Sequence, residues 1–456
     1  MYKYTKITAS VGPKSENRDV LTKMVHAGVN AFRLNFSHDT GSVQGAKIDL
    51  IRSISAELNI PVSIIVDLQG PKHRIGNFAT EDKYKLKIGQ MFVFDTDQTP
   101  GDSTRVELPH PDVIQSLNVG DRILLNDGKI EMRVMETEPN RIIAKVIRGT
   151  EIWSRRGFNL PDTLVDTSVL TDKDRKDLEY AITKNPDWVA VSFVQSASDI
   201  EYVRDFITSR TSHPIKIIAK IERPHAVEQI SDIVSVADGI MIARGDLAVE
   251  MPFEQVPAIS RNIIRICRQQ NKPVIMATQM LASMVDGEFP TRAEISDVAN
   301  ASYLRVDSTM TSEETTIGVN PVHVINTMSK ILSYSDSDTI ANPYDLPRIE
   351  NIPENNWSRS VSSMAYLNKT SAIVVFDKDG VATTDIACRR PDIPIISVCN
   401  DMTVANQLAL VRGVFPMFDS ELFAMRDGFG AAHRFGINFG QVVIVDDGKI
   451  SLRVCC

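Results

Sequence analysis

The sequence predicts an α/β protein built on a (β/α)₈ TIM barrel, with an all-β lid domain inserted into the barrel and a smaller α/β domain at the C-terminal end. Three observations predict this fold. Apolar runs alternate with amphipathic stretches up to about residue 330, one interruption has a period of two, and a polar segment precedes a last group of apolar runs. Alternating strands and helices imply parallel strands that are buried on both faces. Eight such strands indicate a closed barrel.

Eight apolar runs have the character of buried parallel strands. They cover residues 6–10, 31–34, 62–68, 188–193, 216–221, 239–243, 274–277 and, most weakly, 305–311. Helix signals separate these runs. Thr171 and Ser196 occupy N-cap positions before amphipathic stretches, and Asn271 with Pro273 ends another before the seventh strand. We therefore assign residues 1–70 and 168–332 to the barrel.

The barrel pattern is interrupted by residues 71–167, where the apolar period is two. The runs YKLKIGQMFVF, DRILLNDGKIEMRV and RIIAKVI carry this period. The Asn126-Asp127-Gly128 triplet has the residues that a tight hairpin needs where φ is positive. This insert follows the third strand, at the end of the barrel where active sites form, so we expect it to act as a lid.

Residues 333–353 are polar, contain prolines and show no helical period, and we predict that they form a linker. Beyond the linker, the apolar runs AIVVF, IPIISVC and QVVIVDD alternate with helical stretches. Residues 354–456 are therefore predicted to form the second α/β domain.

The bulk composition excludes several classes of protein. The 456 residues carry a formal net charge of −8, and the acidic balance disfavours binding to nucleic acid or anionic membranes. No apolar run approaches the length of a membrane span, and the first residues lack the apolar core of a secretory signal. The five cysteines show no metal-binding or disulfide pattern, so we expect a reduced, cytoplasmic protein. In that compartment the tripeptide Arg244-Gly245-Asp246 is not an adhesion motif.

Polar side chains gather where five of the predicted strands end, in the segments FRLNFSH, VDLQGPKHR, IIAKIE, ARGDL and MATQM. Catalytic residues of barrels come from these ends. Glu222 and Asp246 follow adjacent strands, so their carboxylates could share one Mg²⁺ or Mn²⁺. Lys220 shares a face with Glu222, and a lysine in a barrel interior is costly unless it meets an anion.

Together with Arg33, these residues describe a site that neutralises a phosphoryl group in transfer. Taken singly, each residue is more often part of a surface salt bridge. Their joint occurrence favours a metal-dependent enzyme that acts on an anionic substrate.

The motifs as a set resemble those of the pyruvate kinase family. TASVGPKS, RLNFSH, DLQGPK, GFNLP, IIAKIE, ARGDL, ATQML, PTRAE and SDVANA look like that family's motifs and occur in its order. The resemblance covers the barrel and the insert densely and the C-terminal domain loosely. It implies transfer of a phosphoryl group from phosphoenolpyruvate to ADP, with protonation of the enolate to pyruvate, and it implies a homotetramer.

The resemblance also implies roles for individual residues. Lys220 would stabilise the phosphoryl group in transfer, Glu222 and Asp246 would bind the divalent metal, and Thr278 would lie near the carbon that is protonated. The backbone N–H groups around Gly245 and Asp246 would hold the substrate carboxylate. Contacts with phosphates or nucleotide are implied for Arg33, Asn35, His38, Arg74 and Arg156.

The monovalent-cation site of the family is altered in this sequence. Asn35, Ser37 and Asp67 match its K⁺ ligands, but the hydroxyl residue that should follow is Leu68. Family members that require K⁺ usually have Glu where this chain has Lys72. A lysine ammonium supplies a cation covalently, and we expect the enzyme to be K⁺-independent. The alternative is that Lys72 is simply exposed at the lid hinge.

The eighth strand departs most from the family. Ser312 and Glu314 match its motif, but Glu313 replaces a glycine, and Ser308 and Thr309 replace apolar residues. Glycine permits backbone conformations that glutamate resists, so the geometry of Ser312 and Glu314 is open. Ala248 likewise replaces a glycine. These changes raise a second hypothesis, a catalytically weakened paralogue that binds phosphoenolpyruvate or nucleotide as a regulatory module.

A third hypothesis is another metal-dependent barrel acting on pyruvate, such as an aldolase, but the β insert and the PTRAE run argue against it. The C-terminal segment FDKDGVATTD, residues 376–385, matches the loop that holds a sugar bisphosphate in the family. It is acidic and lacks the arginine of that loop. We therefore expect little or no activation by fructose 1,6-bisphosphate, because the loop repels a polyanion.

Overall fold

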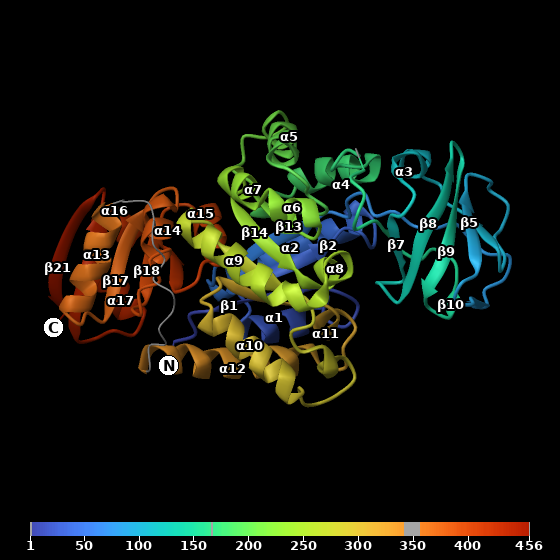
Figure 1. Ribbon diagram of the computed structural model, residues 1–456. Coiled ribbons are helices and arrows are strands. Elements are labelled where there is room, and N and C mark those ends of the chain that lie inside the picture. Colours follow the sequence, from blue (N-terminus) through green and yellow to red (C-terminus); the bar gives the residue numbers. More distant parts are fainter. Residues whose placement is uncertain (1, 166, 342–355, 456) are drawn as a thin grey trace.

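The computed structural model describes residues 2–165, 167–341 and 356–455. In Figure 1 a barrel occupies the centre of the molecule, an all-β body lies on one side of it and an α/β body on the other. The all-β body is continuous with the barrel through the segments after β3 (Ser63–Asp67) and before α4 (Asp172–Ile182). The predicted architecture of barrel, β insert and C-terminal α/β domain is confirmed.

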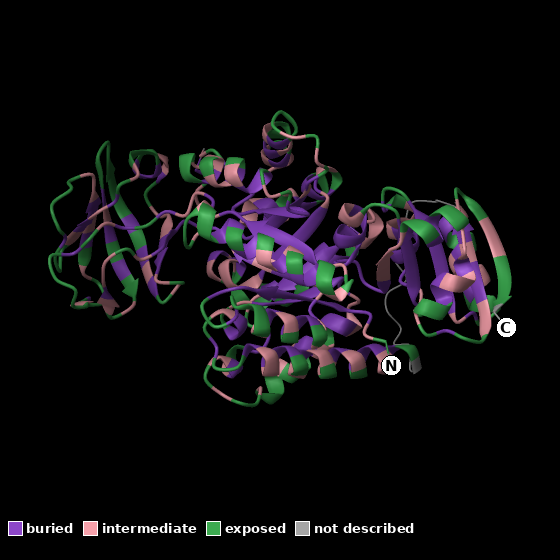
Figure 2. Ribbon diagram, turned by 180° about the vertical axis from the view of Figure 1, so that it is seen from behind, coloured by how far each residue is buried: buried purple, intermediate pink, exposed green. Residues whose placement is uncertain are grey.

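Eight parallel strands close the central barrel in the order β1-β16-β15-β14-β13-β12-β3-β2. Besides β3, they are β1 (Lys6–Ser10), β2 (Ala31–Asn35), β12 (Trp188–Val191), β13 (Lys216–Ile221), β14 (Gly239–Ala243), β15 (Val274–Ala277) and β16 (Ser308–Thr311). Nearly all of their residues are buried, as expected for strands covered on both faces, and Figure 2 shows them as a purple interior. The last strand begins at Ser308 and not at residue 305, because Arg305 adopts a positive φ of 57° just after a helix end.

Helices surround the barrel. They are α1 (Arg18–His26), α2 (Gly41–Leu58), α4, α5 (Ala197–Thr208), α6 (Pro224–Glu228), α7 (Ile230–Val236), α8 (Arg244–Glu250), α9 (Val256–Gln269), α10 (Arg292–Tyr303), α11 (Glu313–Thr316) and α12 (Pro321–Ala341), with short 3₁₀ turns at Phe253–Gln255 and Ala282–Val285. Thr171 caps α4, since its hydroxyl accepts from Asp174 N at 3.1 Å while Thr171 N donates to Asp174. The N-cap predicted at this residue is confirmed.

The inserted domain contains a six-stranded and a two-stranded sheet. Its elements are β4 (Tyr84–Lys85), β5 (Met91–Asp95), β6 (Arg105–Glu107), α3 (Pro111–Ser116), β7 (Arg122–Leu125), β8 (Ile130–Glu138), β9 (Arg141–Arg148), β10 (Glu151–Ile152) and β11 (Phe158–Asn159). β7 and β8 pair antiparallel across the predicted hairpin. Asn126, Asp127 and Gly128 there have φ of 51°, 53° and 78°, which is the left-handed backbone that this turn requires.

The C-terminal domain is a five-stranded sheet in the order β19-β18-β17-β20-β21. The strands are β17 (Ala372–Asp377), β18 (Ile395–Cys399), β19 (Val414–Phe418), β20 (Gly440–Asp446) and β21 (Lys449–Cys455), and the helices are α13 (Asn356–Leu367), α14 (Val381–Ala387), α15 (Met402–Leu408), α16 (Ser420–Met425) and α17 (Gly428–Arg434). Four strands are parallel, while β21 runs antiparallel along the edge and is much more exposed than its neighbours (Figure 2).

The linker predicted at residues 333–353 is wrong in its first part, because α12 continues as a helix to Ala341. The helical face there is polar and buried, so no apolar period revealed it. Asp336 is fully buried and accepts hydrogen bonds from Tyr4 N (2.8 Å) and Thr5 N (2.9 Å), and it pairs with Arg412 of the C-terminal domain at 2.8 Å. Residues 342–353 lie outside the described part of the chain.

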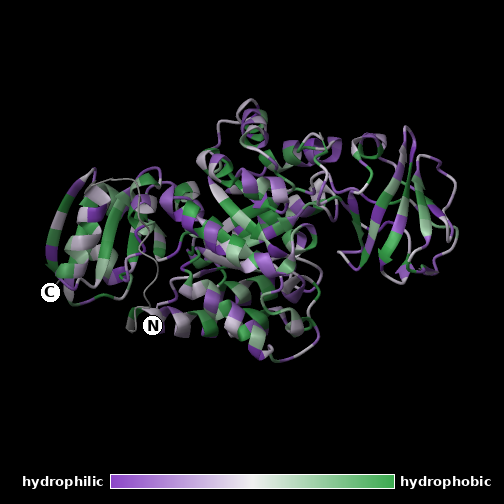
Figure 3. Ribbon diagram, in the orientation of Figure 1, coloured by the Kyte–Doolittle hydropathy of each residue, from purple (hydrophilic) through white to green (hydrophobic). Residues whose placement is uncertain are grey.

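Hydropathy follows the same division between interior and surface: in Figure 3 the central strands are hydrophobic while the outer helices mix both colours. Within the described residues, no helix combines the length and the apolar character needed to cross a bilayer. Cys267, Cys388 and Cys399 are buried free thiols.

Candidate active site

Lys220 lies at the centre of the polar cluster at the carboxyl ends of the barrel strands. It stands on β13, and its Nζ lies 3.2 Å from Asp67 Oδ1 at the end of β3 and 3.1 Å from Glu222 Oε1. The two carboxylates are almost fully buried, and the lysine side chain is 11% exposed. The alternation of strand side chains places residues 220 and 222 on one face, as predicted.

Arg33 adds a second cation from β2, the strand that pairs with β3. Its Nε lies 2.5 Å from Asp67 Oδ2, and one of its terminal nitrogens donates to Ser10 Oγ at 3.0 Å. Burial acts to raise the pKa of Asp67, but Arg33 and Lys220 outweigh burial and hold this pKa below its usual value. Asp67 therefore remains ionised and fixes both cations at the mouth of the barrel.

The charge states of Lys220 and Glu222 follow from their surroundings. Burial lowers the pKa of Lys220, but Asp67 and Glu222 more than compensate and raise it above its ordinary value. Burial raises the pKa of Glu222; Lys220 opposes this effect and nearby Asp246 adds to it. The site thus holds a permanent ammonium beside a carboxylate that lacks full compensation.

Two residues of the fourth strand end belong to the site although sequence reasoning missed them. Ser192 Oγ accepts from Lys220 Nζ at 2.6 Å and donates to Leu68 O at 2.7 Å, which fixes the direction of the ammonium. The backbone N–H of Phe193 donates to Glu222 Oε2 at 2.8 Å. The rule that active sites lie at strand ends would have found both residues if it had been applied to this strand.

Asp246 lies in the first turn of α8, directly after β14. Lys72, in the segment that enters the lid, places its Nζ 3.3 Å from Asp246 Oδ1. The two side chains are 25% and 32% exposed. Lys72 therefore pairs with Asp246 where the chain enters the lid.

Glu222 and Asp246 form the candidate metal site. They follow β13 and β14, which are hydrogen-bonded neighbours with Ile221 beside Ile242. Within residues 2–165, 167–341 and 356–455, no cluster of three or more His, Cys, Asp or Glu is arranged to hold a metal ion. Two carboxylates with free positions for water and substrate oxygens suit Mg²⁺.

Thr278 approaches α8 from the end of β15. Its Oγ1 accepts a hydrogen bond from Gly245 N at 2.8 Å. The N–H of Gly245, which was expected to meet a substrate carboxylate, thus has a protein partner in this structure. Arg244, the residue before it, donates to Thr278 O at 2.6 Å and to the Asp297 carboxylate at 2.7 and 2.8 Å.

Arg74 and Arg156 lie in the two segments that join the lid to the barrel. The segments form a bridge between Arg74 and Gly157, and Ile75 N donates to Arg156 O at 3.1 Å. The Arg156 guanidinium lies 4.9 Å from the ring centre of Trp153. Both arginines contact lid residues and neither contacts Lys220 or Glu222 directly.

The remaining residues expected at the nucleotide and monovalent-cation sites follow β2. Asn35 Oδ1 accepts from Ser37 N at 3.1 Å, so the two residues form one local turn beside Arg33. His38 is exposed at the next position. Arg33 and Lys220 are the two cations that contact Asp67. Lys72 contacts Asp246 instead.

A buried hydrogen bond joins the lid to the barrel. Asn159 Nδ2, on the strand that returns from the lid, donates to Glu250 Oε1 at the end of α8 at 2.7 Å. Both side chains are buried, and burial raises the pKa of Glu250. Because α8 also carries Gly245 and Asp246, this bond links the inserted domain to the helix that contributes to the candidate active site.

The polar side chains of the unusual eighth strand have hydrogen-bond partners inside the barrel. Ser308 Oγ contacts Thr8 Oγ1 at 2.8 Å and Thr309 Oγ1 contacts Met328 Sδ at 3.2 Å, so both buried hydroxyls have partners. Glu313 is exposed and begins α11. Glu314 points inward, accepting from Leu281 N at 3.1 Å and Ser312 N at 2.6 Å, which holds the end of the strand against the loop after β15.

Comparisons with known proteins identify the family. The family model described as pyruvate kinase, barrel domain matches residues 2–325, and the one described as pyruvate kinase, alpha/beta domain matches residues 355–448. Curated pyruvate kinases of Methylorubrum extorquens and Agrobacterium vitis are each 38% identical, over 95% and 96% of this chain and 90% and 94% of theirs. The crystal structure of a pyruvate kinase from Cryptosporidium parvum has a TM-score of 0.94 at 29% identity, covering 100% of this chain and 96% of that one. The chain therefore belongs to the pyruvate kinase family.

Proposed function

We propose that the chain transfers the phosphoryl group of phosphoenolpyruvate to ADP, giving ATP and pyruvate. The observation that carries this proposal is the Lys220 ammonium, held between Asp67 and Glu222 at the mouth of the barrel. Arg33 adds a second fixed cation 2.5 Å from Asp67. Cations arranged in advance lower the barrier to phosphoryl transfer, because they need no reorganisation when charge develops on the moving group.

Each residue of the site has a defined task in this reaction. Arg33 and Lys220 bind the phosphoryl oxygens while the bond to the enol oxygen breaks and the ADP oxygen takes the phosphorus. Glu222 and Asp246 would hold a Mg²⁺ or Mn²⁺ ion, which supplies charge neutralisation at the transferred group and the substrate carboxylate. The first turn of α8, with Gly245 and Asp246, is proposed to bind that carboxylate.

The enolate that remains must take a proton on carbon. Thr278 is the residue proposed to deliver it, because its hydroxyl stands at the end of β15 next to the first turn of α8. Arg74 and Arg156, at the base of the lid, are proposed to meet the phosphates of the nucleotide together with Asn35 and His38. Closure of the lid would bring these groups over the barrel and exclude water from the reaction.

We further propose that K⁺ is not required. The support is Lys72, whose ammonium lies 3.3 Å from Asp246 and supplies positive charge where the family's K⁺-dependent members carry a carboxylate.

The alternative of a weakened regulatory paralogue is not favoured. The substitutions in the eighth strand are either satisfied inside the barrel or exposed, and Ser312 and Glu314 still brace the loop after β15. None of the charged groups around Lys220 is missing.

We propose a cytoplasmic homotetramer. The buried free thiols suit a reducing compartment. Large apolar side chains are exposed on the barrel and on the edge strand β21, with Phe253 and Phe289 each 78% and Val454 58% exposed, and such surfaces often mark contacts between subunits. Analytical ultracentrifugation tests this; a monomer at micromolar concentration would contradict it.

The function is tested by ATP formation from phosphoenolpyruvate and ADP with Mg²⁺, in tetramethylammonium buffer free of K⁺. We expect full activity there, and no ATP when either substrate or the divalent metal is omitted. An active enzyme that K⁺ stimulates strongly would refute K⁺ independence alone. A chain that binds phosphoenolpyruvate but forms no ATP under any of these conditions would support the regulatory alternative.

A further inference from the structure

Thr278 and Gln279, after β15, have an unusual backbone. Their φ values are 70° and 54°, in the left-handed region that residues other than glycine rarely adopt. For the β-branched Thr278 this conformation costs on the order of 1–3 kcal/mol and persists only where surrounding groups enforce it. Something in the fold must therefore hold this segment.

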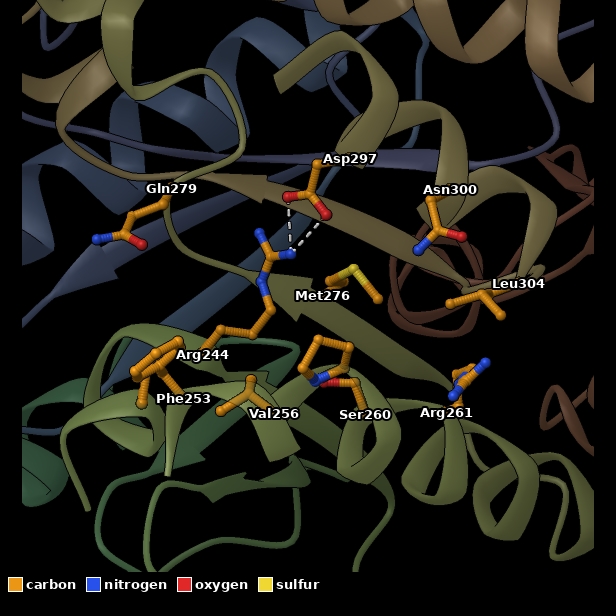
Figure 4. A pocket seen from close by; sticks show the side chains of 12 residues that line it. Arg244, Phe253, Val256, Ser260, Arg261, Met276, Gln279, Asp297, Asn300 and Leu304 are labelled. Atoms are coloured by element: carbon orange, nitrogen blue, oxygen red, sulfur yellow. Dashed lines mark hydrogen bonds and ion pairs between the residues drawn. The ribbon is translucent and has the colours of Figure 1, made fainter. Parts of the chain in front are cut away.

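The guanidinium of Arg244 is the group that does so. It donates to Thr278 O at 2.6 Å and to Ala277 O at 3.2 Å. These are the backbone carbonyls of the two residues that precede Gln279. The third nitrogen of Arg244 donates to both oxygens of Asp297 on α10 at 2.8 and 2.7 Å (Figure 4). The arginine thus joins the loop after β15 to a helix on the outer wall of the barrel.

Arg244 and Gly245 are adjacent and hold Thr278 from two sides. Arg244 binds the carbonyl of Thr278, while the N–H of Gly245 donates to its hydroxyl at 2.8 Å. The two contacts determine both where the threonine backbone lies and where Oγ1 points. Loss of the first would let the segment relax to an ordinary backbone conformation and turn the hydroxyl away.

Packing does not replace these hydrogen bonds, because Arg244 and Asp297 line a cavity of about 410 Å³ between α9 and α10. Val256, Met276 and Leu304 form apolar parts of its wall (Figure 4). Arg244 therefore borders open space on one side, while its polar partners hold the guanidinium on the others. The same space would admit a small cation if the side chain were shortened.

We propose that Arg244, fixed by Asp297, is a positioning residue that orients the Thr278 hydroxyl for proton transfer to the enolate carbon. This inference rests on the role proposed above for Thr278. It predicts that loss of the guanidinium impairs proton transfer at carbon more than phosphoryl transfer, which depends on Lys220 and Arg33. A lysine is a poor substitute, because one ammonium cannot reproduce three separately directed N–H groups.

The test compares two reactions of the full-length protein. The first is exchange of the pyruvate methyl protons with D₂O, followed by NMR with Mg²⁺ and ATP present. The second is ATP formation from phosphoenolpyruvate and ADP. Arg244→Ala and Arg244→Lys are the test variants, and Thr278→Val is the reference for lost proton transfer. Arg204→Ala is the matched control, since Arg204 likewise joins a carboxylate (Asp238, 2.9 Å) to a backbone carbonyl (Val236, 2.8 Å) outside the site.

In Arg244→Ala and Arg244→Lys we expect exchange to fall by roughly 10²-fold, as for a misplaced catalytic group, and ATP formation to fall by less than about tenfold. Millimolar guanidinium chloride should restore exchange in Arg244→Ala by entering the cavity, and should leave Thr278→Val and Arg204→Ala unchanged. Retained thermal midpoints would show that the variants fold.

Equal losses of both reactions in the Arg244 variants, or no recovery with guanidinium, would overturn the inference while leaving the proposed role of Thr278 intact. Normal exchange in Thr278→Val would overturn that role and the inference with it. If only Arg244→Lys folds, its ratio of exchange to ATP formation decides, and an unchanged ratio counts against the proposal.

Discussion

The side-chain amide of Asn159 lies 2.7 Å from the carboxylate of Glu250, so a buried hydrogen bond joins the lid to the helix that carries Gly245 and Asp246. The second carboxylate oxygen of Glu250 is buried without a hydrogen-bond partner among the described residues. Removal of the amide would leave both oxygens of a buried acid uncompensated, a situation that costs on the order of 1–3 kcal/mol.

For Asn159→Leu we therefore expect a lid that closes less readily. The KM for ADP should rise several-fold, because Arg74 and Arg156 belong to the lid base, and the KM for phosphoenolpyruvate should change less. Steady-state kinetics with each substrate varied measures this. Asn118→Ala, at an exposed turn of the same lid, is the control and should behave as the parent; an unchanged KM for ADP in Asn159→Leu would argue against the coupling.

Replacement of Lys220 should abolish most of the activity. Lys220→Met removes the ammonium between Asp67 and Glu222, and loss of one such group costs roughly 10²–10³-fold or more in kcat. Lys220→Arg keeps the charge but not the geometry, so its kcat should lie between those of the parent and Lys220→Met. ATP formation is the measurement.

Lys6→Met is the matched control for Lys220, because Lys6 is another lysine buried on a barrel strand, at the opposite end. Its ammonium donates to Val414 O and lies 4.4 Å from the ring centre of Phe415. We expect it to lower stability and leave kcat within a few-fold of the parent. Comparable losses of kcat in the two methionine variants would mean that Lys220 acts only through folding.

Reversal of charge at residue 72 should create a requirement for K⁺. In Lys72→Glu a second carboxylate faces Asp246, and the repulsion should lower activity by roughly tenfold in K⁺-free buffer and be relieved by added KCl. The measurement is the initial rate against KCl concentration, with ionic strength held constant by tetramethylammonium chloride. Lys87→Glu makes the same change of charge at an exposed position of the lid and should show no response. A K⁺-insensitive Lys72→Glu would disprove the idea.

The loop after β17 should not bind a sugar bisphosphate. The Asp377 carboxylate accepts hydrogen bonds from Gly380 N at 2.9 Å and Thr383 N at 2.7 Å, so N–H groups that would hold a phosphate already have an anionic partner. We expect fructose 1,6-bisphosphate to leave the half-saturating concentration of phosphoenolpyruvate unchanged. Isothermal titration calorimetry should show no heat of binding, and a marked shift of half-saturation would contradict this.

Asp187, just before β12, should make stability depend on pH. Burial raises its pKa from 3.8 to about 6, against the opposing influence of Arg52. The folded state thus binds the proton more tightly than the unfolded chain, and the free energy of unfolding should rise as the pH falls from about 6 to about 4. The full effect is on the order of 3 kcal/mol.

Asp187→Asn keeps an acceptor for Ile64 N and removes the titrating group. Urea unfolding of parent and variant between pH 4 and pH 7.5 should show the parent gaining stability relative to the variant as the pH is lowered. A difference that is constant over this range, or that changes in the opposite direction, would show that Asp187 is charged in the folded state throughout.

Much of this architecture could be predicted from the sequence because the signals are local. Apolar runs give the barrel strands, and the Asn126-Asp127-Gly128 turn gives the lid hairpin. The strand-end rule places Lys220, Glu222, Asp246 and Arg33 at the same end of the barrel. Such features need only the residues within a few positions of each strand.

Other features depend on partners that are distant in the sequence. The end of α12 looked like a linker because Asp336 and its polar neighbours face inward, and their partners include Thr5 and Arg412. The pairing of Arg244 with Asp297 has no signal in the spacing of residues. The contact of Lys72 with Asp246 depends on where the lid emerges from the barrel. No periodic pattern encodes these contacts.

The carboxylate of Asp336 also links parts of the molecule that have separate hydrophobic cores. It accepts hydrogen bonds from the backbone N–H groups of Tyr4 and Thr5, which precede β1, and β1 closes the barrel against β16. It also pairs with Arg412 from the C-terminal domain. Barrel closure and attachment of that domain therefore share one buried anion. On heating, the barrel and the C-terminal domain should therefore unfold in a single cooperative transition. Substitutions near the start of β1 or near Arg412 should then affect the stability of both parts.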